Sequence, residues 1–228
     1  QSNGFREYIL TQGIHNDKII FYPNPTEEFY KPLKEVNEYK EFFKSDFFNI
    51  VFAGNIGEAQ SFKTIIEAVN NIKELPVNVI VIGDGRYKKT ALNLIKEKGL
   101  ENHFNFLDSF PSTEMPKFFA HADGLLVSLK KNKIFSLTIP AKIQSYLACA
   151  KPIIASIDGI GAKIVTDANC GVVSPAENML VLSDRIKELM SLDKSKLYEM
   201  GMNSRTYYEK EFDRTYLLEK LEAILEDR

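Results

Sequence analysis

The chain has 228 residues, enough for one large domain or two small ones, and its 44% hydrophobic content supplies a sizeable core. Its 29 basic and 31 acidic residues leave a net charge of −2, so bulk charge does not favour a nucleic-acid partner. No apolar run approaches the length of a membrane span. Cys149 and Cys170 lie in apolar stretches without metal-ligand spacing, which indicates buried thiols in a reducing compartment and no metal site.

The first 45 residues read as the middle of a longer chain. They begin with Gln1, and no signal peptide follows. The pattern predicts a helix that ends at Gly13 and a short strand over Lys18–Tyr22. We therefore expect a fragment of a larger protein, with residues 1–45 as an interdomain segment and the remnant of an N-terminal half.

From Phe47 onward, apolar β-rich runs alternate with helical patterns that carry apolar residues three and four positions apart. Strands are predicted at Asn49–Ala53, Val77–Ile82, Phe104–Leu107, Gly124–Ser128, Ile153–Ala155 and Gly171–Val173. This alternation predicts an α/β fold over residues 46–195, a Rossmann-like, doubly wound, mostly parallel sheet. Residues 196–228 are predicted to form two amphipathic helices. Ligands bind beyond the carboxyl ends of strands in such sheets, so candidate site residues follow each strand.

Gly83-Asp84-Gly85 follows one predicted strand and precedes a helix, a local shape that cradles phosphates. A dinucleotide fingerprint needs a third glycine about three residues later, and position 88 is lysine. The motif is therefore a weak nicotinamide-dinucleotide signal. It either forms one wall of a phosphate site or serves only to make a turn.

Gly54 and Gly57 belong to a second strand–glycine–helix unit. No Gly-Lys-Ser/Thr follows them, which excludes a P-loop. The amides of Asn55 and Gln60 either donate hydrogen bonds to an anion or a sugar, or they cap a turn.

The stretch "SLTIPAKIQSYLACAKPIIAS" is the most distinctive in the chain. Pro140 suits the first turn of a helix, and Lys142 lies in that same turn. A cation there opposes the helix dipole, so a bound diphosphate would account for it. The alternative is a solvated lysine in an exposed first turn, with little packing. The run Lys130–Lys133 is either a solvated loop or a group that steers substrate.

Six segments in order resemble the C-terminal, donor-binding half of a GT-B-fold glycosyltransferase of family 4. They are "IIFYPNPTEEFYKP", "GNIGEAQSFKTIIEAV", "VIVIGDGRYKKTAL", "FFAHADGLLVSL", "PAKIQSYLACAKPIIAS" and "GIGAKIVTDANCGVVSPAENMLVLSDRIKELM". Within that family, "GNIGEAQ" and "PAKIQSYLACAKP" most resemble bacterial transferases that move N-acetylated or deoxy-amino sugars in surface-polysaccharide assembly.

The resemblance implies a retaining glycosyltransferase of cell-surface polysaccharide or glycan synthesis. Its substrate would be a nucleotide-sugar, UDP-linked, with no metal or other cofactor. The resemblance leaves the catalytic residue unassigned. It implies donor contacts at Gly54, Asn55, Gly57, Gln60, Gly83, Asp84, Gly85, Arg86, Ser109, Phe110, Thr138, Ala141, Lys142 and Ser145.

The sequence departs from the family pattern at the charged positions. Asn55 and Gln60 stand where many members have an arginine and a lysine that bind diphosphate. The two donor-motif glutamates match Leu137 and Ser145. Ala150 replaces the glycine before the "KP" pair. Lys142, its helix N-terminus and Arg86 are then expected to offset the diphosphate charge.

The resemblance also implies a partner, the N-terminal acceptor-binding half, without which this chain is inactive. It implies a cytoplasmic protein, associated with the inner membrane face when full length. The last helix would cross back to the missing half, which leaves the apolar stripe Leu217, Leu221 and Ile224 exposed or paired with another molecule. Two alternatives stay open: one half of a sugar-nucleotide 2-epimerase, and a catalytically dead nucleotide-binding or scaffold module, which the loss of both glutamates favours.

Overall fold

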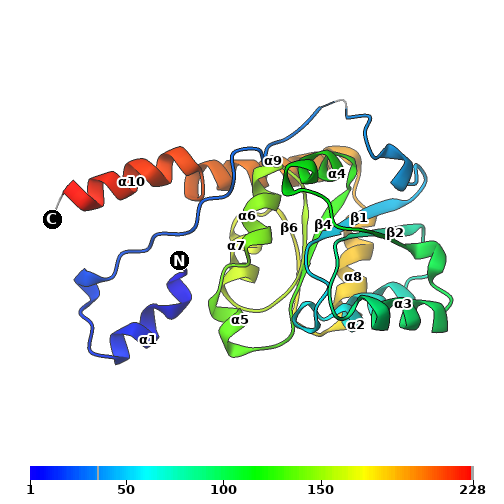
Figure 1. The fold of residues 1–228 in the computed structure, drawn as a ribbon, viewed down its shortest axis with the longest axis horizontal. Helices are drawn as coiled ribbons and strands as arrows, with labels where there is room; N and C mark the ends of the chain where they lie inside the picture. Colours follow the sequence, from blue (N-terminus) through cyan, green and yellow to red (C-terminus); the bar gives the residue numbers. More distant parts are fainter. Residues whose placement is uncertain (35, 227–228) are drawn as a thin grey trace.

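The computed structural model describes residues 1–34 and 36–226. In this part of the chain a six-stranded parallel sheet has the order β3-β2-β1-β4-β5-β6 (Figure 1). The strands are β1 (Phe48–Ala53), β2 (Val77–Ile82), β3 (Phe104–Leu107), β4 (Gly124–Ser128), β5 (Ile153–Ser156) and β6 (Gly171–Ser174). The predicted α/β class and the six predicted strands from β1 to β6 are confirmed.

The central strands are largely apolar because both of their faces are covered; Asn49 and Asn78 are the polar residues of β1 and β2. All six residues of β2 are buried, and β2 pairs in register with β1 from Phe48↔Val77 to Ala53↔Ile82. A strand of this kind reads as a continuous apolar run, whereas a strand with one wet face alternates. Burial on both sides is thus visible in the sequence of β2.

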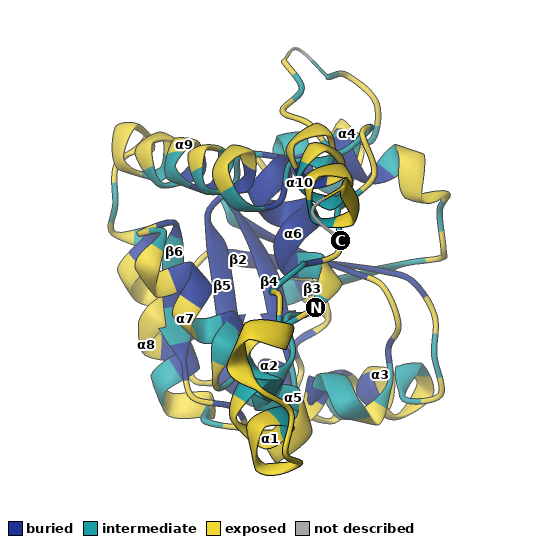
Figure 2. Cartoon of the chain, turned by 90° about the vertical axis from the view of Figure 1, so that its left-hand side faces the viewer, coloured by how far each residue is buried: buried dark blue, intermediate teal, exposed yellow. Residues whose placement is uncertain are grey.

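The helices form a layer on each face of the sheet (Figure 2). Apolar residues of α4, α6, α7 and α9 pack on one face, and those of α2, α3 and α8 pack on the other. The helix bounds are α1 (Arg6–Thr11), α2 (Phe62–Asn70), α3 (Lys88–Glu97), α4 (Met115–His121), α5 (Lys133–Leu137), α6 (Ala141–Ala148), α7 (Ile160–Asp167), α8 (Met179–Met190), α9 (Lys194–Glu211) and α10 (Arg214–Glu226).

The order of the strands reverses between β1 and β4. From β1 the chain moves outward to β2 and β3, and it then returns to β4 on the other side of β1. The loops that leave β1 and β4 therefore turn in opposite directions and open a crevice at the carboxyl ends of the strands. This switch point is where a ligand site is expected.

The predicted strand over Lys18–Tyr22 is wrong. A short 3-10 turn occupies Asn16–Lys18, and the residues after it join no sheet. The Arg6 guanidinium takes the place of a neighbouring strand, donating to the backbone oxygen of Ile19 at 3.2 Å and to Asn16 Oδ1 at 2.7 Å. Apolar content alone did not show that this segment has no strand to pair with.

The two helices predicted at the C-terminus are confirmed as α9 and α10. Leu217, however, is fully buried, so the expectation of its exposure is wrong. The N-terminal segment, residues 1–34, lies against α10. Arg214 pairs with Glu28 at 3.6 Å, and the Lys220 ammonium lies 6.0 Å from the centre of the Phe21 ring.

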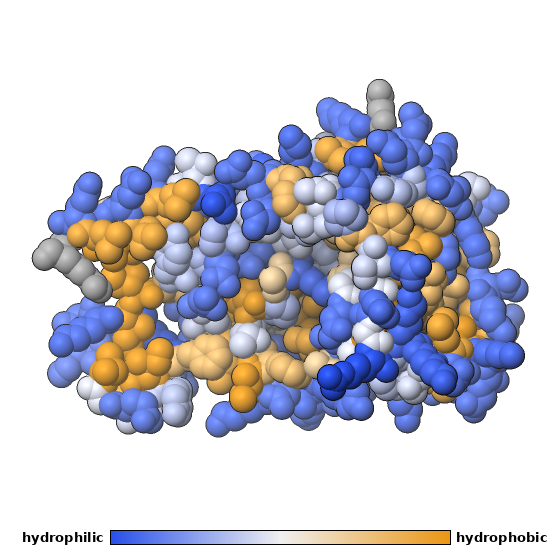
Figure 3. Space-filling model, viewed as in Figure 1, coloured by the Kyte–Doolittle hydropathy of each residue, from blue (hydrophilic) through white to orange (hydrophobic). Residues whose placement is uncertain are grey.

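The exposed large apolar side chains of α10 are instead Tyr216, Leu218 and Leu225, at 45%, 45% and 62% exposure, whereas Leu221 and Ile224 are half-buried. Figure 3 shows apolar side chains gathered over α10 and the N-terminal segment. None of the described helices combines the length and the apolar character needed to cross a membrane.

Candidate functional site

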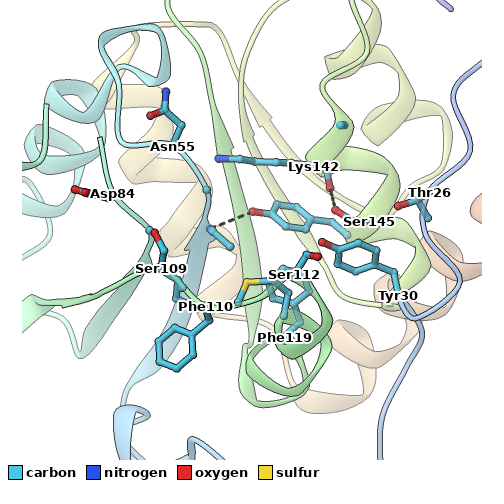
Figure 4. Close-up of a pocket in the computed structure, with 17 residues that line it drawn as sticks. Thr26, Tyr30, Asn55, Asp84, Ser109, Phe110, Ser112, Phe119, Lys142 and Ser145 are labelled. Atoms are coloured by element: carbon cyan, nitrogen blue, oxygen red, sulfur yellow. Dashed lines mark hydrogen bonds between the residues drawn. The ribbon is translucent and has the colours of Figure 1, made fainter. Parts of the chain in front are cut away.

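A cavity of about 490 Å³ opens at the switch point, beyond the carboxyl ends of β1, β2 and β3 and beside the N-terminus of α6 (Figure 4). Four of the segments that the sequence singled out meet here. Nine of the predicted site residues line the cavity: Gly54, Asn55, Gly83, Asp84, Ser109, Phe110, Ala141, Lys142 and Ser145. The fold thus assembles one concave surface from turns that lie far apart in the chain.

The other predicted residues, Gly57, Gln60, Gly85, Arg86 and Thr138, are not among those that line the cavity. Gln60 Oε1 accepts hydrogen bonds from the Gly57 amide at 3.1 Å and from Asn55 Nδ2 at 3.4 Å, so Gln60 caps its own turn. Thr138 Oγ1 donates to the Phe135 carbonyl at 2.9 Å, at the end of α5. Arg86 is exposed. Of the two open alternatives for Gln60, the structure shows turn capping.

The glycines after β1 and β2 let two loops touch backbone to backbone. The Gly54 amide donates to the Ile82 carbonyl at 2.8 Å, and a Cβ on Gly83 would lie 2.2 Å from the Gly54 oxygen. Gly83 also has a φ of +138°, which L side chains rarely adopt. Both constraints require glycine at position 83, and the contact closes one wall of the cavity.

Lys142 is not the solvated side chain that an exposed first turn would give. A Cβ on Gly54 would lie 2.9 Å from Lys142 Cε, so the lysine stem crosses the bare backbone of this glycine. The Lys142 ammonium lies 3.5 Å from the centre of the buried Phe52 ring. Desolvation lowers the pKa of Lys142 to about 7. Among the described residues no carboxylate forms an ion pair with it.

The N-terminus of α6 faces the same cavity. Pro140 is its N-cap and offers no side-chain acceptor. The Ile143 amide donates to the Pro140 carbonyl at 2.9 Å, which leaves the amides of Ala141 and Lys142 free to bond a ligand. Ala141, the first helical residue, lines the cavity together with Lys142. The partial positive charge of the helix end and the nearby ammonium both favour an anion at this point.

The next turn of α6 is tied to the backbone around it. Ser145 Oγ donates to the Lys142 carbonyl at 3.1 Å. The Tyr146 hydroxyl donates to the Leu126 carbonyl at 3.3 Å and accepts from the Ala53 amide at 3.5 Å. Burial raises the pKa of Tyr146 above its usual range, so this phenol stays neutral. These bonds fix α6 against β1 and β4, and with it the position of Lys142.

Several lining residues were missed in the sequence: Thr26, Tyr30, Ala53, Ile82, Ser112, Met115, Phe119 and Tyr146. Tyr146 lies four residues after Lys142 and so on the same face of α6, a spacing that predicts its position. Thr26 and Tyr30 come from the segment before the sheet, and no local pattern places them here. Within residues 1–34 and 36–226, no group of three His, Cys, Asp or Glu side chains is arranged to hold a metal ion.

Residues 34–207 match the family described as "Glycosyl transferases group 1". The chain is 24% identical over 173 residues to the Escherichia coli K12 protein named "Putative colanic acid biosynthesis glycosyl transferase WcaI", covering 74% of this chain and 40% of that protein. It is 25% identical over 161 residues to the uncharacterized glycosyltransferase MJ1178 of Methanocaldococcus jannaschii, covering 70% of this chain and 43% of that protein. The chain thus spans about two fifths of the length of these curated relatives.

Solved structures share the fold. A glycosyltransferase from Rickettsia africae superimposes with a TM-score of 0.86 and 16% identity, over 99% of this chain and 62% of that one. Anabaena HepE, solved in complex with UDP and glucose, gives a TM-score of 0.83 and 18% identity, over 100% of this chain and 62% of that one. The sheet described above is the Rossmann-like half of a GT-B fold, and the family match over most of the chain establishes that it belongs to the group 1 glycosyl transferases.

Proposed function

We propose that this chain is the donor-binding half of a retaining glycosyltransferase and that its ligand is a UDP-linked sugar. The observation that carries the proposal is the meeting of Lys142 with the uncapped N-terminus of α6 in one cavity. A nucleotide-sugar carries two negative charges on its diphosphate, and this is the part of the cavity with matching charge.

The neutral side chains after β1 make Lys142 the principal cation for this task. Asn55 lines the cavity with an amide, and Gln60 is turned into its own loop. A charge-assisted hydrogen bond contributes about 1.5–3 kcal/mol. The free amides of Ala141 and Lys142 would add neutral hydrogen bonds to the same oxygens.

The related proteins support both the ligand and the setting. HepE, whose fold this chain shares, was solved with UDP and glucose and also with UDP-glucose. The Escherichia coli relative carries a name from colanic acid biosynthesis, which supports a role in cell-surface polysaccharide synthesis. We extend both properties to this chain as part of the proposal.

The geometry suggests how the donor half would assist transfer. As the bond between sugar and diphosphate breaks, negative charge grows on the departing diphosphate. The Lys142 ammonium and the α6 amides would stabilise that charge more in the transition state than in the ground state, which accelerates the reaction. They are held in place beforehand by Tyr146 and by the glycine contact at Gly54.

The acceptor would come from a separate N-terminal half, which we also propose to bring the full-length protein to the inner membrane face. Residues 1–228 alone should then transfer no sugar, whereas a chain extended at its N-terminus should. Measurable transfer by residues 1–228 alone would contradict this part of the proposal.

Binding of the donor is tested by a thermal-shift screen of residues 1–228 against UDP-, GDP- and ADP-sugars. A ligand that binds only the folded protein raises the protein's melting temperature. Well above the dissociation constant, this rise grows with the logarithm of the ligand concentration. The proposal expects the largest rise with a UDP-sugar. No rise with any nucleotide-sugar would contradict the proposal and favour a scaffold module.

A further inference from the structure

The segment before the sheet contributes to the cavity wall. Thr26 and Tyr30 both line the cavity, although they precede β1 in the chain. Gln144 of α6 anchors this segment by donating from Nε2 to the Asn24 carbonyl at 2.7 Å. The Tyr30 amide closes a turn on the Glu27 carbonyl at 3.1 Å. Side-chain and backbone bonds thus hold the segment against the cavity.

The Tyr30 ring has a defined place. It stacks on Phe119, with ring centres 6.4 Å apart and planes 14° apart, and it packs at 4.6 Å against Phe29. Phe119 is buried, whereas Tyr30 is half-buried. These aromatic contacts fix the direction of the Tyr30 Cζ–O bond at little further cost in conformational entropy.

The Tyr30 hydroxyl has no hydrogen-bond partner among the described residues, and Figure 4 shows it directed into the cavity. Partly buried tyrosine hydroxyls usually find a partner. Desolvation raises the pKa of Tyr30, so the phenol is a neutral donor and acceptor at neutral pH. Thr26 and Ser112 also place hydroxyls on this cavity without a partner in the described part of the chain.

We propose that Tyr30 is a donor-binding residue whose hydroxyl bonds to a sugar hydroxyl of the nucleotide-sugar. This inference rests on the proposed function. The anionic part of the ligand matches Lys142 and the α6 amides, whereas Tyr30, Thr26 and Ser112 carry only uncharged hydroxyls. Hydroxyls that both donate and accept match ring hydroxyls of a sugar. The partner belongs either to the ribose or to the transferred sugar.

Tyr30→Phe removes the hydroxyl and keeps the ring on Phe119. The affinities of wild type and variant are measured by calorimetry for UDP, UDP-glucose and 2′,3′-dideoxy-UDP. Tyr198→Phe, at a side chain 71% exposed on α9, is the matched control. Loss of one neutral hydrogen bond should weaken binding about 3- to 10-fold, while the melting temperature and the control stay as in wild type.

A loss for UDP and UDP-glucose that disappears with the dideoxy nucleotide supports a ribose contact. A loss for UDP-glucose alone supports a contact with the transferred sugar. Equal affinities of wild type and Tyr30→Phe for all three ligands would overturn the inference, as would an equal loss for all three. If wild type binds none of the three, it is the proposed function that fails, and the two failures are therefore distinguishable.

Discussion

The Lys142 ammonium lies 3.5 Å from the centre of the Phe52 ring, above a glycine that leaves room for its stem. Phe52 is fully buried, so one side of the ammonium faces an aromatic ring instead of water. Without an anion this arrangement costs free energy, because the ammonium is desolvated and has no carboxylate partner among the described residues. A bound diphosphate would remove that cost.

Lys142→Met should weaken nucleotide-diphosphate binding about 10- to 100-fold, which corresponds to the loss of one charge-assisted hydrogen bond. Methionine keeps the apolar stem over Gly54 and removes a desolvated charge, so the melting temperature should not fall. Calorimetry checks the affinity. Lys194→Met, at an exposed lysine on α9, is the control. Equal donor affinity of Lys142→Met and wild type would show that Lys142 does not bind the diphosphate and that backbone amides alone hold it.

Donor binding should take up a proton at pH 8. The pKa of Lys142 is lowered from 10.5 to about 7 in the free protein, so most molecules at pH 8 carry a neutral amine. A bound diphosphate raises that pKa again, and the amine gains its proton. Affinity for a nucleotide-sugar should therefore fall as the pH rises above 7 and stay level well below 7.

This proton uptake is measured by titrating UDP-glucose in buffers with different ionisation enthalpies. The apparent binding enthalpy should depend on the buffer at pH 8 and much less at pH 6. Lys142→Met should abolish the dependence. A binding enthalpy that is independent of buffer in the wild type at pH 8 would show that Lys142 does not change its protonation on binding.

Gly54→Ala should disturb both the fold and the site. Position 54 has a φ of +129°, and the new Cβ would lie 2.9 Å from Lys142 Cε. Backbone strain of this kind costs about 1–3 kcal/mol of unfolding free energy, and displacement of the lysine should add at least a roughly tenfold loss of donor affinity.

Gly99→Ala is the matched control for Gly54→Ala. Gly99 has a φ of +65° and nothing within 4 Å of a new Cβ. It should lose about 1–2 kcal/mol of unfolding free energy and no donor affinity. Urea unfolding and calorimetry measure the two effects separately. If the two variants bind the donor equally well, Gly54 does not hold open the space for Lys142.

The sheet could be predicted because burial on both faces makes the central strands largely apolar. Val77–Ile82 is an example in which the predicted and observed bounds coincide. The prediction of a strand over Lys18–Tyr22 was wrong because the composition of a segment cannot show whether a neighbouring strand is available. In the structure the Ile19 carbonyl accepts a hydrogen bond from the Arg6 side chain, a contact that no alternation of apolar and polar residues in the sequence indicates.

The candidate site was predicted in part from the order of strands along the chain. Topology brings the ends of neighbouring parallel strands together, so residues after β1, β2 and β3 could be expected to meet. The position of Tyr30 in the cavity could not be predicted, because it depends on how the segment before β1 packs across the folded domain. The partial burial of Lys142 also escaped prediction, since it depends on Phe52 and Gly54, about 90 residues earlier in the chain.

Ala150→Gly should stabilise the protein. Ala150 follows α6 with a φ of +55°, a left-handed conformation that costs an L residue about 1–2 kcal/mol. Glycine removes this strain, but its greater freedom in the unfolded state costs about 0.5–1 kcal/mol. The free energy of unfolding should therefore rise by about 0.5–1 kcal/mol. Chemical denaturation measures it. Ala223→Gly, on an exposed face of α10, should instead destabilise the protein. A loss of stability in Ala150→Gly would contradict the strain at this position.

A crystal structure of residues 1–228 with UDP-glucose bound would show directly whether Lys142 and α6 hold the diphosphate. We expect the diphosphate in the cavity between β1 and α6, within hydrogen-bond distance of Lys142 Nζ and of the Ala141 and Lys142 amides. A diphosphate bound outside this cavity, or one inside it that makes no contact with Lys142 or α6, would contradict this expectation.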